Sequence, residues 1–574
     1  FFEGSVCLQI RATKLSLALV AALATMSVSS VSVASSTADA TGNINVIGGN
    51  QQTQTNDYKV DIKFDSASKP NKPTVGSVTF TGTNNINADK YALRIYADAN
   101  NCGIKPFLGQ YEAPELNVNF EKDSLTDISV NAQNGDTAIL ITGHNDQHAT
   151  VSYRGDVNFN VKEGATLNVS NKNTGHGEPT SDAIEIRVED DALSDSSLTM
   201  TESPEKANHI NVNFQGSGNI TTEGGAGFYL LQSGQGNINV SLSDQVHITT
   251  NGSDLNERPY HMANHGINAV VQESYYSKAP TGASTSNGIN INKGTINLNS
   301  AASIEVNGAY AAGVYAHNAS GDVIIQTTNQ LHATGEYARG IQVEASEGKT
   351  TITNDASITL NKLSDQQTQK SHAVGIEVTV KENNTIFRND KNGIKTDEKF
   401  GKGNGIVNIT NNGSIDAAGT QTIGIRVDRV AKEQATAKDV LDSANVIDIK
   451  NNEDMALKGE GSKGIEVKNS GIASENIHIA NNGWLNLTGA KTFGIDVDNK
   501  FGDVTVESAG AITLTQSQTQ TSKESTQSGL NKNPESVGIK ATAQNGSVTI
   551  YANKSNKPKD YSLTIDGVSK AVGI

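Results

Sequence analysis

The sequence predicts an all-β fold, a right-handed parallel β-helix with three short strands in each turn. One observation is a spacing of six and then ten residues between apolar positions, as in Ile409, Ile415 and Ile425. A second observation is that a glycine, here Gly424, stands directly before the third apolar position. One such unit cannot bury its apolar face alone, so the copies must stack into a solenoid. The same spacing recurs in Leu298, Ile304 and Val314; in Ile325, Leu331 and Ile341; in Ile449, Met455 and Ile465; and in Ile479, Leu485 and Ile495.

The composition favours a single repetitive domain with a thin core over several globular domains with large cores. Of the 574 residues, 35% are hydrophobic and 5% aromatic, and Gly (54) far outnumbers Pro (10). This is too polar for thick cores, yet the alternating Val and Ile residues argue against disorder. The net charge of −16 is dispersed along the chain without a basic run, which disfavours nucleic acid as a partner. The two cysteines, Cys7 and Cys102, exclude a disulfide framework.

Residues 1–40 read as an N-terminal extension with a secretory signal peptide. Arg11 and Lys14 precede an apolar run over 15–24, and a tract of small residues ends at Ala38-Asp39-Ala40. The order of a basic region, an apolar region and an A-x-A pattern predicts cleavage after Ala40, with Ala34 as a second candidate. The apolar run is too short to span a membrane.

The rest of the chain divides into a cap and the β-helix. Residues 41–75 are polar with weak strand patterns, and we expect them to cap the first edge of the stack. Residues 76–574 parse into about thirteen turns, which at the spacing of paired strands give a rod of roughly 60 Å. The chain stops inside the repeated closing motif, so we expect the helix to be truncated before its C-terminal end.

Two corners of each turn have recognisable residues. We expect the paired asparagines to adopt left-handed backbone angles and to hydrogen-bond along the stack through their amides. We expect the glycine before each third strand to lie where a side chain would collide with the next turn. These structural positions are Asn411, Asn412, Asn451, Asn452, Asn481 and Asn482, and Gly313, Gly340, Gly375, Gly424, Gly464, Gly494, Gly538 and Gly573.

Insertions interrupt the repeat at two of the three corners. Segments 379–404 and 429–444 follow third strands, and the second of them has a helical pattern. Segments 361–372 and 515–536 follow second strands. Loops of this kind usually carry the contacts of a solenoid.

An export signal followed by irregularly spaced turns of the form I-x-N-N-G-x-I-x-x-x-G-x-x-x-x-G-I-x-V resembles the passenger region of bacterial autotransporters. The resemblance covers roughly residues 41–574 and is architectural. It implies a C-terminal β-barrel in the outer membrane that is not present in this fragment. It also implies display on the surface of a Gram-negative bacterium, or secretion, and contact with a host-surface protein or glycan.

Short motifs that suggest binding have structural explanations in this repeat. Arg154-Gly155-Asp156 spells an integrin-binding tripeptide, but Gly-Asp-Val also opens first strands at 321–323 and 502–504. We therefore interpret the tripeptide as an arginine before a standard corner, and keep it only as a weak binding candidate. Trp484 is expected to face solvent, where it either stacks on a sugar or has no function.

No catalytic, metal or cofactor site is assigned from the sequence. His144 with His148, and His261 with His265, form H-x-x-x-H, but both pairs are interpreted as solvated loop histidines. The chain contains no P-loop, dinucleotide fingerprint, serine-protease motif or nucleophile elbow. Positions between the Ile and Val of successive closing motifs are expected to form a solvated ladder of alternating charge: Gln342, Glu377, Arg426, Glu466, Asp496 and Lys540.

The sequence thus favours a rigid scaffold for adhesion or host interaction, which binds through its corner loops and needs no cofactor. One alternative is a carbohydrate-active enzyme, a polysaccharide lyase or hydrolase, with an acid cleft on the ladder. That alternative rests on analogy with other β-helices. A purely structural stalk is the third possibility.

Overall fold

The structure is a computed structural model of the whole chain, and most of the repeat is described in it. The described residues are 36–38, 43–51, 60–64, 75–89, 92–98, 115–131, 136–144, 150–151, 155–172, 181–189, 207–233, 236–252, 264–272, 294–318, 321–361, 371–381, 389–390, 393–394, 405–430, 445–470, 475–515, 536–552, 563–566 and 571–572.

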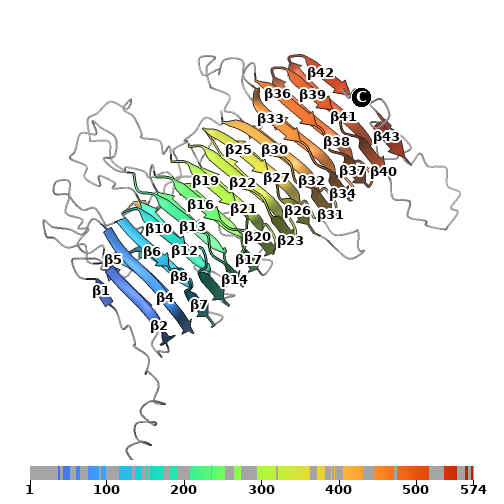
Figure 1. Cartoon of the computed structure of the whole chain (residues 1–574). Helices are drawn as coiled ribbons and strands as arrows, with labels where there is room; N and C mark the ends of the chain where they lie inside the picture. Colours follow the sequence, from blue (N-terminus) through green and yellow to red (C-terminus); the bar gives the residue numbers. More distant parts are fainter. Residues whose placement is uncertain are drawn as a thin grey trace, which may run out of the picture.

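The chain coils into a parallel β-helix, as the sequence predicts (Figure 1). A 16-stranded sheet holds the third strand of each turn, and a 26-stranded sheet holds the first and second strands. Counted from β4 to the last described strand, thirteen turns follow one another. No helix in the described part of the chain is long and apolar enough to cross a membrane.

The strands fall into three series. The first strands after β4 are β6 (Glu115–Phe120), β10 (Val157–Val161), β13 (Ile210–Phe214), β16 (Ile238–Leu242), β19 (Ile296–Ser300), β22 (Val323–Thr327), β25 (Lys349–Asn354), β30 (Ile406–Asn411), β33 (Asn445–Asn451), β36 (Asn476–Asn481), β39 (Val504–Ser508) and β42 (Val548–Ala552). The second strands are β7 (Leu125–Val130), β11 (Thr166–Asn171), β14 (Gly218–Thr222), β17 (Val246–Asn251), β20 (Ser303–Asn307), β23 (Gln330–Thr334), β26 (Ser357–Leu360), β31 (Ile415–Ala418), β34 (Met455–Lys458), β37 (Leu485–Thr488), β40 (Ile512–Thr515) and β43 (Leu563–Asp566). The third strands are β5 (Leu93–Asp98), β8 (Ile139–His144), β12 (Ile184–Glu189), β15 (Phe228–Ser233), β18 (Ile267–Gln272), β21 (Ala312–Asn318), β24 (Arg339–Ala345), β27 (Val374–Lys381), β32 (Ile423–Val430), β35 (Lys463–Asn469), β38 (Phe493–Phe501), β41 (Ser536–Asn545) and β44 (Ala571–Val572).

The N-terminal strands extend the same two sheets. β4 (Val75–Ala88) serves as both first and second strand of its turn, because it pairs with β6 and with β7. The segment predicted to be the cap carries β2 (Asn43–Gln51) and β3 (Val60–Phe64), which pair in parallel with β4 and β5 and add a turn. β1 (Ser36–Ala38) pairs with β3, so cleavage after Ala40, which lies outside the described residues, would remove it.

Three very short strands lie outside the repeat. β9 (Thr150–Val151) is antiparallel to β8, and β28 (Asn389–Asp390) is antiparallel to β29 (Gly393–Ile394).

The three apolar positions of each copy stack in register on their counterparts. Ile409 pairs with Ile449, Ile415 with Met455, and Ile425 with Ile465. The next turn continues the same three columns. The predicted spacing of six and ten residues therefore gives the register in which successive turns pair.

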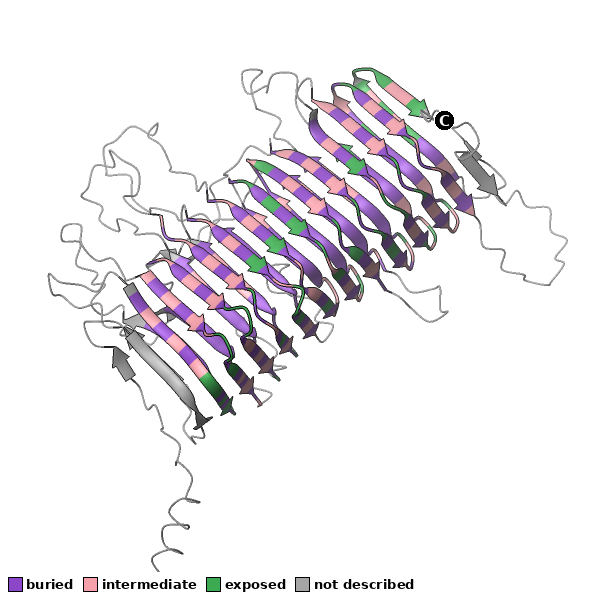
Figure 2. Cartoon of the chain, in the orientation of Figure 1, coloured by how far each residue is buried: buried purple, intermediate pink, exposed green. Residues whose placement is uncertain are grey.

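These columns form the core. Along the first and second strands, buried residues alternate with partly exposed ones, which Figure 2 shows as bands of alternating colour. The third strands are buried at most positions. Near the N-terminal end the Phe80 and Phe120 rings stack with centroids 4.6 Å apart. Each fully buried Ile, Val or Phe stabilises the fold by about 1.5–3 kcal/mol, so stability accumulates over many equivalent small contributions.

The glycine that precedes each closing Ile is required by close packing, as predicted, but it lies inside the third strand and not before it, since β32 begins at Ile423. A Cβ on Gly424 would lie 2.6 Å from the carbonyl oxygen of Gly464 and 2.4 Å from the sulfur of Met455. Gly375 and Gly464 meet the next turn in the same way. Gly573 lies outside the described residues.

The asparagine corner is confirmed in its hydrogen bonds but not in its backbone. Asn411 Nδ2 donates to Asn451 Oδ1 at 2.8 Å and to the carbonyl of Gly413 at 2.8 Å, which closes the turn. Asn451 donates to Asn481 at 2.9 Å. The expected left-handed angles are wrong here, since none of the six asparagines is among the described residues with positive φ. Because the side-chain amide closes the corner, ordinary backbone angles suffice.

Left-handed angles occur instead at the corner between the second and third strands. Tyr310, Tyr337, Gln421 and Lys491 have φ of 59°, 58°, 58° and 55°. A glycine with positive φ stands two residues before each of them. The corner therefore points one side chain per turn along the edge of the third-strand sheet.

The insertions are shorter than predicted where their ends are described. β27 continues to Lys381 and β32 to Val430, so segments 379–404 and 429–444 begin inside strands. The predicted helix, after Val430, lies outside the described residues, as does most of 361–372 and 515–536.

Replacing Asn411 by alanine should destabilise the helix much more than the same change at Asn412. Asn411 is fully buried, and its loss leaves one side-chain N–H of Asn354 and the side-chain oxygen of Asn451 without a partner, which costs about 1–3 kcal/mol. Asn412 hydrogen-bonds to Asp355 and Asn452 at the exposed surface, where the cost stays below about 0.5 kcal/mol. Urea unfolding followed by circular dichroism measures both, and equal shifts would contradict the ladder.

Candidate functional site: a charged groove on the third-strand sheet

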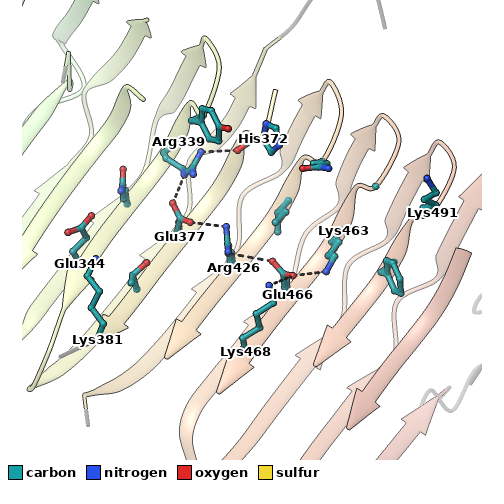
Figure 3. A pocket seen from close by; sticks show the side chains of 17 residues that line it. Arg339, Glu344, His372, Glu377, Lys381, Arg426, Lys463, Glu466, Lys468 and Lys491 are labelled. Atoms are coloured by element: carbon teal, nitrogen blue, oxygen red, sulfur yellow. Dashed lines mark hydrogen bonds and ion pairs between the residues drawn. The ribbon is translucent and has the colours of Figure 1, made fainter. Parts of the chain in front are cut away.

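A groove of about 620 Å³ crosses the outer face of the third-strand sheet over five successive turns (Figure 3). Its floor is formed by β24, β27, β32, β35 and β38, and one wall by the corners that precede them. The lining residues are Tyr337, Arg339, Gln342, Glu344, His372, Glu377, Thr379, Lys381, Gln421, Ile423, Arg426, Gly461, Lys463, Glu466, Lys468, Lys491 and Phe493.

Strand periodicity aims one row of side chains into this groove. In each Gly-Ile-x-Val motif the Ile and Val point to the core, so the residue between them points outward. Parallel register then places Glu377 beside Arg426, Arg426 beside Glu466, and Glu466 beside Asp496. The predicted ladder is therefore a real column of neighbours.

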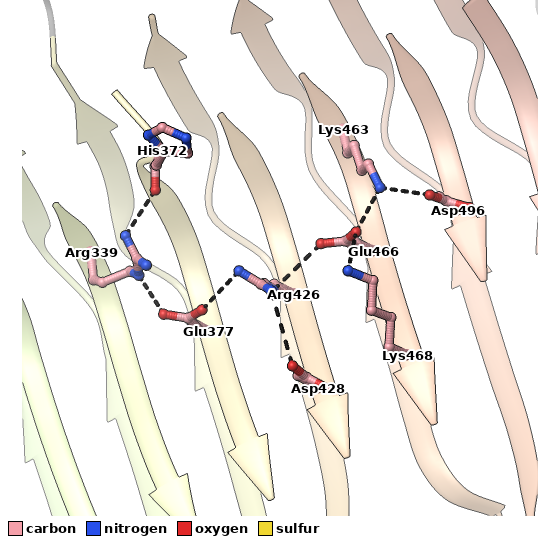
Figure 4. Close-up of polar contacts among 9 residues, drawn as sticks. All are labelled: Arg339, His372, Glu377, Arg426, Asp428, Lys463, Glu466, Lys468 and Asp496. Atoms are coloured by element: carbon pink, nitrogen blue, oxygen red, sulfur yellow. Dashed lines mark hydrogen bonds and ion pairs between the residues drawn. The ribbon is translucent and has the colours of Figure 1, made fainter. Parts of the chain in front are cut away.

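The ladder is joined into one chain of ion pairs (Figure 4). Arg339 Nε pairs with Glu377, whose other oxygen lies 3.4 Å from Arg426 Nη1. Arg426 Nε lies 3.4 Å from Glu466. Lys463 Nζ then lies 2.6 Å from both Glu466 and Asp496, so one ammonium group joins the acids of two adjacent turns.

The expectation that this ladder is solvated is wrong for its acids. The Glu377 and Glu466 side chains are 10% and 5% exposed, although both lie on the outer face of the sheet. Residues just before the glycine of each motif cover them: Arg339 reaches Glu377, and Lys463 reaches Glu466. The acids thus form a buried layer under their cationic partners.

The pKa shifts agree with this arrangement. Burial alone would raise the pKa of Glu466, but the hydrogen bond and charge of Lys463, with Lys468 and Arg426, outweigh it and lower the pKa. Burial would likewise raise the pKa of Asp496, and Lys463 and Lys540 lower it. For Lys463, burial favours the neutral form, but its two carboxylate partners raise the pKa. All three groups are therefore charged at neutral pH.

The groove collects charged residues that are scattered in the sequence. Its six basic residues are Arg339, Lys381, Arg426, Lys463, Lys468 and Lys491, against three acids, Glu344, Glu377 and Glu466. Asp428, Glu460 and Asp496 lie outside this lining but pair with Arg426, Lys491 and Lys463, so these three cations are neutralised. The charges of the linear sequence do not reveal this cluster, because each turn supplies only one or two of its basic residues.

The left-handed corner residues build the aromatic part of the wall. Tyr310 stacks on Tyr337 with ring centroids 4.6 Å apart, and Tyr337 stacks on His372 at 4.7 Å. The backbone carbonyl of His372 accepts a hydrogen bond from Arg339 Nη1 at 2.9 Å. The wall and the ion-pair network are thereby connected.

A second cluster of charged groups lies on the same sheet, nearer the N-terminus. Glu185 accepts a hydrogen bond from Thr137 Oγ1 at 2.8 Å and pairs with Arg187. Asp182 is 6% exposed, and its carboxylate accepts the backbone N–H of Ala226 at 2.6 Å. Burial, followed by the nearby charge of Glu185, raises the pKa of Asp182 well above its usual value. Both carboxyl groups are buried too deeply to meet a substrate.

The residues kept as weak binding candidates occupy ordinary structural positions of the repeat. Asp156 accepts the backbone N–H of His209 in the next turn at 2.8 Å, while Arg154 lies outside the described residues. Asp322 and Asp503 accept the N–H groups of Lys349 and Ser547 in the same way. Asp156 is therefore engaged in joining two turns. Trp484 faces solvent as predicted, with half of its surface exposed.

The histidine interpretation needs one correction. His265 is fully buried, accepts the backbone N–H of Ala312 on Nδ1 at 3.0 Å, and stacks on Tyr315. It is not a solvated loop histidine, because it occupies the position just before the third strand. His144 ends β8, and His148 and His261 lie outside the described residues. Within the described ranges no group of three or more His, Cys, Asp or Glu residues could hold a metal ion.

Comparison with known proteins does not decide what the groove binds. No family model, curated protein or solved structure matches the chain. The function must therefore be argued from the geometry. A rigid floor, fixed charges and an open face suit the binding of a charged ligand.

Asp182→Asn should stabilise the protein at neutral pH and have little effect in acid. A carboxyl group whose pKa is higher in the folded state is penalised once pH exceeds the pKa of the unfolded chain, and the penalty grows until pH reaches the folded pKa. The amide retains an oxygen for the Ala226 N–H and carries no charge. Urea midpoints at pH 3 and pH 7 measure this, and a variant less stable than wild type at pH 7 would contradict it.

Proposed function

We propose that the chain is the passenger region of a bacterial autotransporter and acts as a surface-displayed binding scaffold in adhesion. The groove on the third-strand sheet is the observation that carries this proposal. It spans five turns of a backbone that is hydrogen-bonded on both sides, so its side chains keep a fixed spacing. A fixed and extended array of charges serves recognition because little entropy is lost on binding.

The groove shifts the proposed binding surface from the corner loops to the third-strand sheet. The sequence places the contacts in corner loops, most of which lie outside the described residues. The described surface offers the groove instead, and its wall is made by residues of a corner, Tyr337, His372 and Lys491. Corner and sheet then act together as one binding face.

The enzyme alternative is favoured by one observation, since acids and bases do share a groove. General acid catalysis by a glycosidase requires a carboxyl group whose pKa is raised toward neutrality. Here the pKa of Glu466 and that of Asp496 are lowered, and Lys463 stays charged. Among the described residues, Asp182 is the acid whose pKa is raised well above its usual value, and it is buried away from the groove. The ionisation states therefore favour binding over catalysis.

Bacteria that carry the full-length gene should display the chain and adhere through it. Antibodies raised against the purified chain should label intact cells. These cells should attach to an epithelial monolayer in larger numbers than isogenic cells without the gene. Labelling only after the cells are broken would contradict surface display.

The same cells separate the other two possibilities. Display without any gain in adhesion would favour the structural stalk. Release of shortened or unsaturated products from polygalacturonate or heparin by the purified chain would favour the enzyme.

A further inference from the structure

We propose that the groove binds an extended acidic polysaccharide whose chain runs along the axis of the helix, across β24, β27, β32, β35 and β38. This inference names the ligand class for the binding face proposed above, and in that respect it rests on the proposed function.

The exposed cations of the groove lie above covered carboxylates. The Lys468 side chain is 53% exposed, and its ammonium group lies 3.2 Å from Glu466, whose side chain is 5% exposed. Glu377 is 10% exposed. Lys491 is 58% exposed but pairs at 2.7 Å with Glu460, which is itself 55% exposed, so these two charges offset each other. Lys381 is also exposed and forms no ion pair with any other described residue. A ligand entering the groove therefore meets the ammonium groups of Lys381 and Lys468 above a neutralised layer, and a negatively charged ligand is favoured.

The spacing of the turns matches the repeat of a sugar chain. Successive turns lie about 4.8 Å apart, and each presents one residue of the ladder and one of the corner. A pyranose in an extended chain has a similar length, so a polysaccharide lying along the axis offers one sugar to each turn. A repeated acidic group on the sugar can then meet a lysine or arginine in successive turns, and contacts accumulate without a deep pocket.

A single-stranded nucleic acid does not fit the groove. Single-stranded nucleic acids bind by stacking their bases on aromatic faces. The Tyr337 ring is covered on one face by Tyr310 and on the other by His372, so neither face can accept a base. The Phe493 ring also lines the groove, but the ammonium groups of Lys463 and Lys540 already lie over it, 5.2 and 5.9 Å from its centroid. Sugar hydroxyl groups need no such face, because they hydrogen-bond to polar groups such as those of Gln342 and Gln421, which line the groove.

A peptide strand does not fit the groove. An extended peptide is bound by hydrogen bonds to the open edge of a sheet. The floor of the groove is the side-chain face of the sheet, where β27, β32 and β35 already pair on both sides. The backbone offers no free donors or acceptors there.

Fluorescence anisotropy of the purified full chain tests this ligand class directly. The probes are labelled hexagalacturonate, the same hexasaccharide fully methyl-esterified, a heparin-derived hexasaccharide and a six-residue oligothymidylate. The carboxylated or the sulfated sugar should bind at least about tenfold more tightly than the ester, with an affinity that falls as salt rises. Which of the two binds more tightly identifies the acidic group.

A pair of matched variants places the binding in the groove. Lys381→Gln with Lys468→Gln should weaken binding about tenfold and flatten its dependence on salt. Lys450→Gln with Lys458→Gln removes the same charge from exposed strands of the other sheet and should leave binding unchanged. Unchanged circular dichroism shows that both variants are folded.

Three results would overturn the inference: equal binding of the ester, equal loss in both double variants, or tighter binding of the oligothymidylate. None of them bears on whether the chain is displayed and adhesive. Conversely, a chain that fails to mediate adhesion can still bind the sugar in solution, so the two failures are distinguishable.

Discussion

Parallel pairing of each strand with its counterpart in the next turn is the constraint on which the whole structure depends. It forces every residue to lie about 4.8 Å from the equivalent residue above and below. Inside, this makes columns of Ile, Leu and Val and a column of asparagine amides. The same constraint requires glycine at the point where Gly424 meets Gly464, because the two backbones touch there.

On the outer face the same constraint creates an electrostatic problem. Like charges in adjacent turns repel each other, and the ladder avoids this by alternating Glu377, Arg426 and Glu466. It fails to alternate once, where Asp496 follows Glu466. Lys463, from the position before the glycine, lies 2.6 Å from both carboxylates and neutralises the pair. The binding face is thus built from the same repeat that builds the core.

The fold was predictable because its signal is periodic. Spacing, strand period and glycine position determine the register, and Ile409, Ile415 and Ile425 stack as expected. The groove was not predictable in the same way. Arg339 and Lys463 occupy a position that holds Ala312 and Val374 in other turns, so no repeat marks them. Whether a ladder residue is buried depends on those side chains and on three-dimensional neighbours, which a linear pattern does not contain.

The ion-pair network also limits how this gene can change. Solenoid genes gain and lose whole repeats by recombination, and a backbone of equivalent turns tolerates this well. Here, deleting the turn that carries Arg426 would bring Glu377 directly against Glu466, two poorly exposed carboxylates without the arginine between them. Deleting the turn that carries Lys463 would leave Arg426 beside Asp496, which is a compatible pair. Turns with equivalent backbones therefore differ in whether the protein tolerates their deletion.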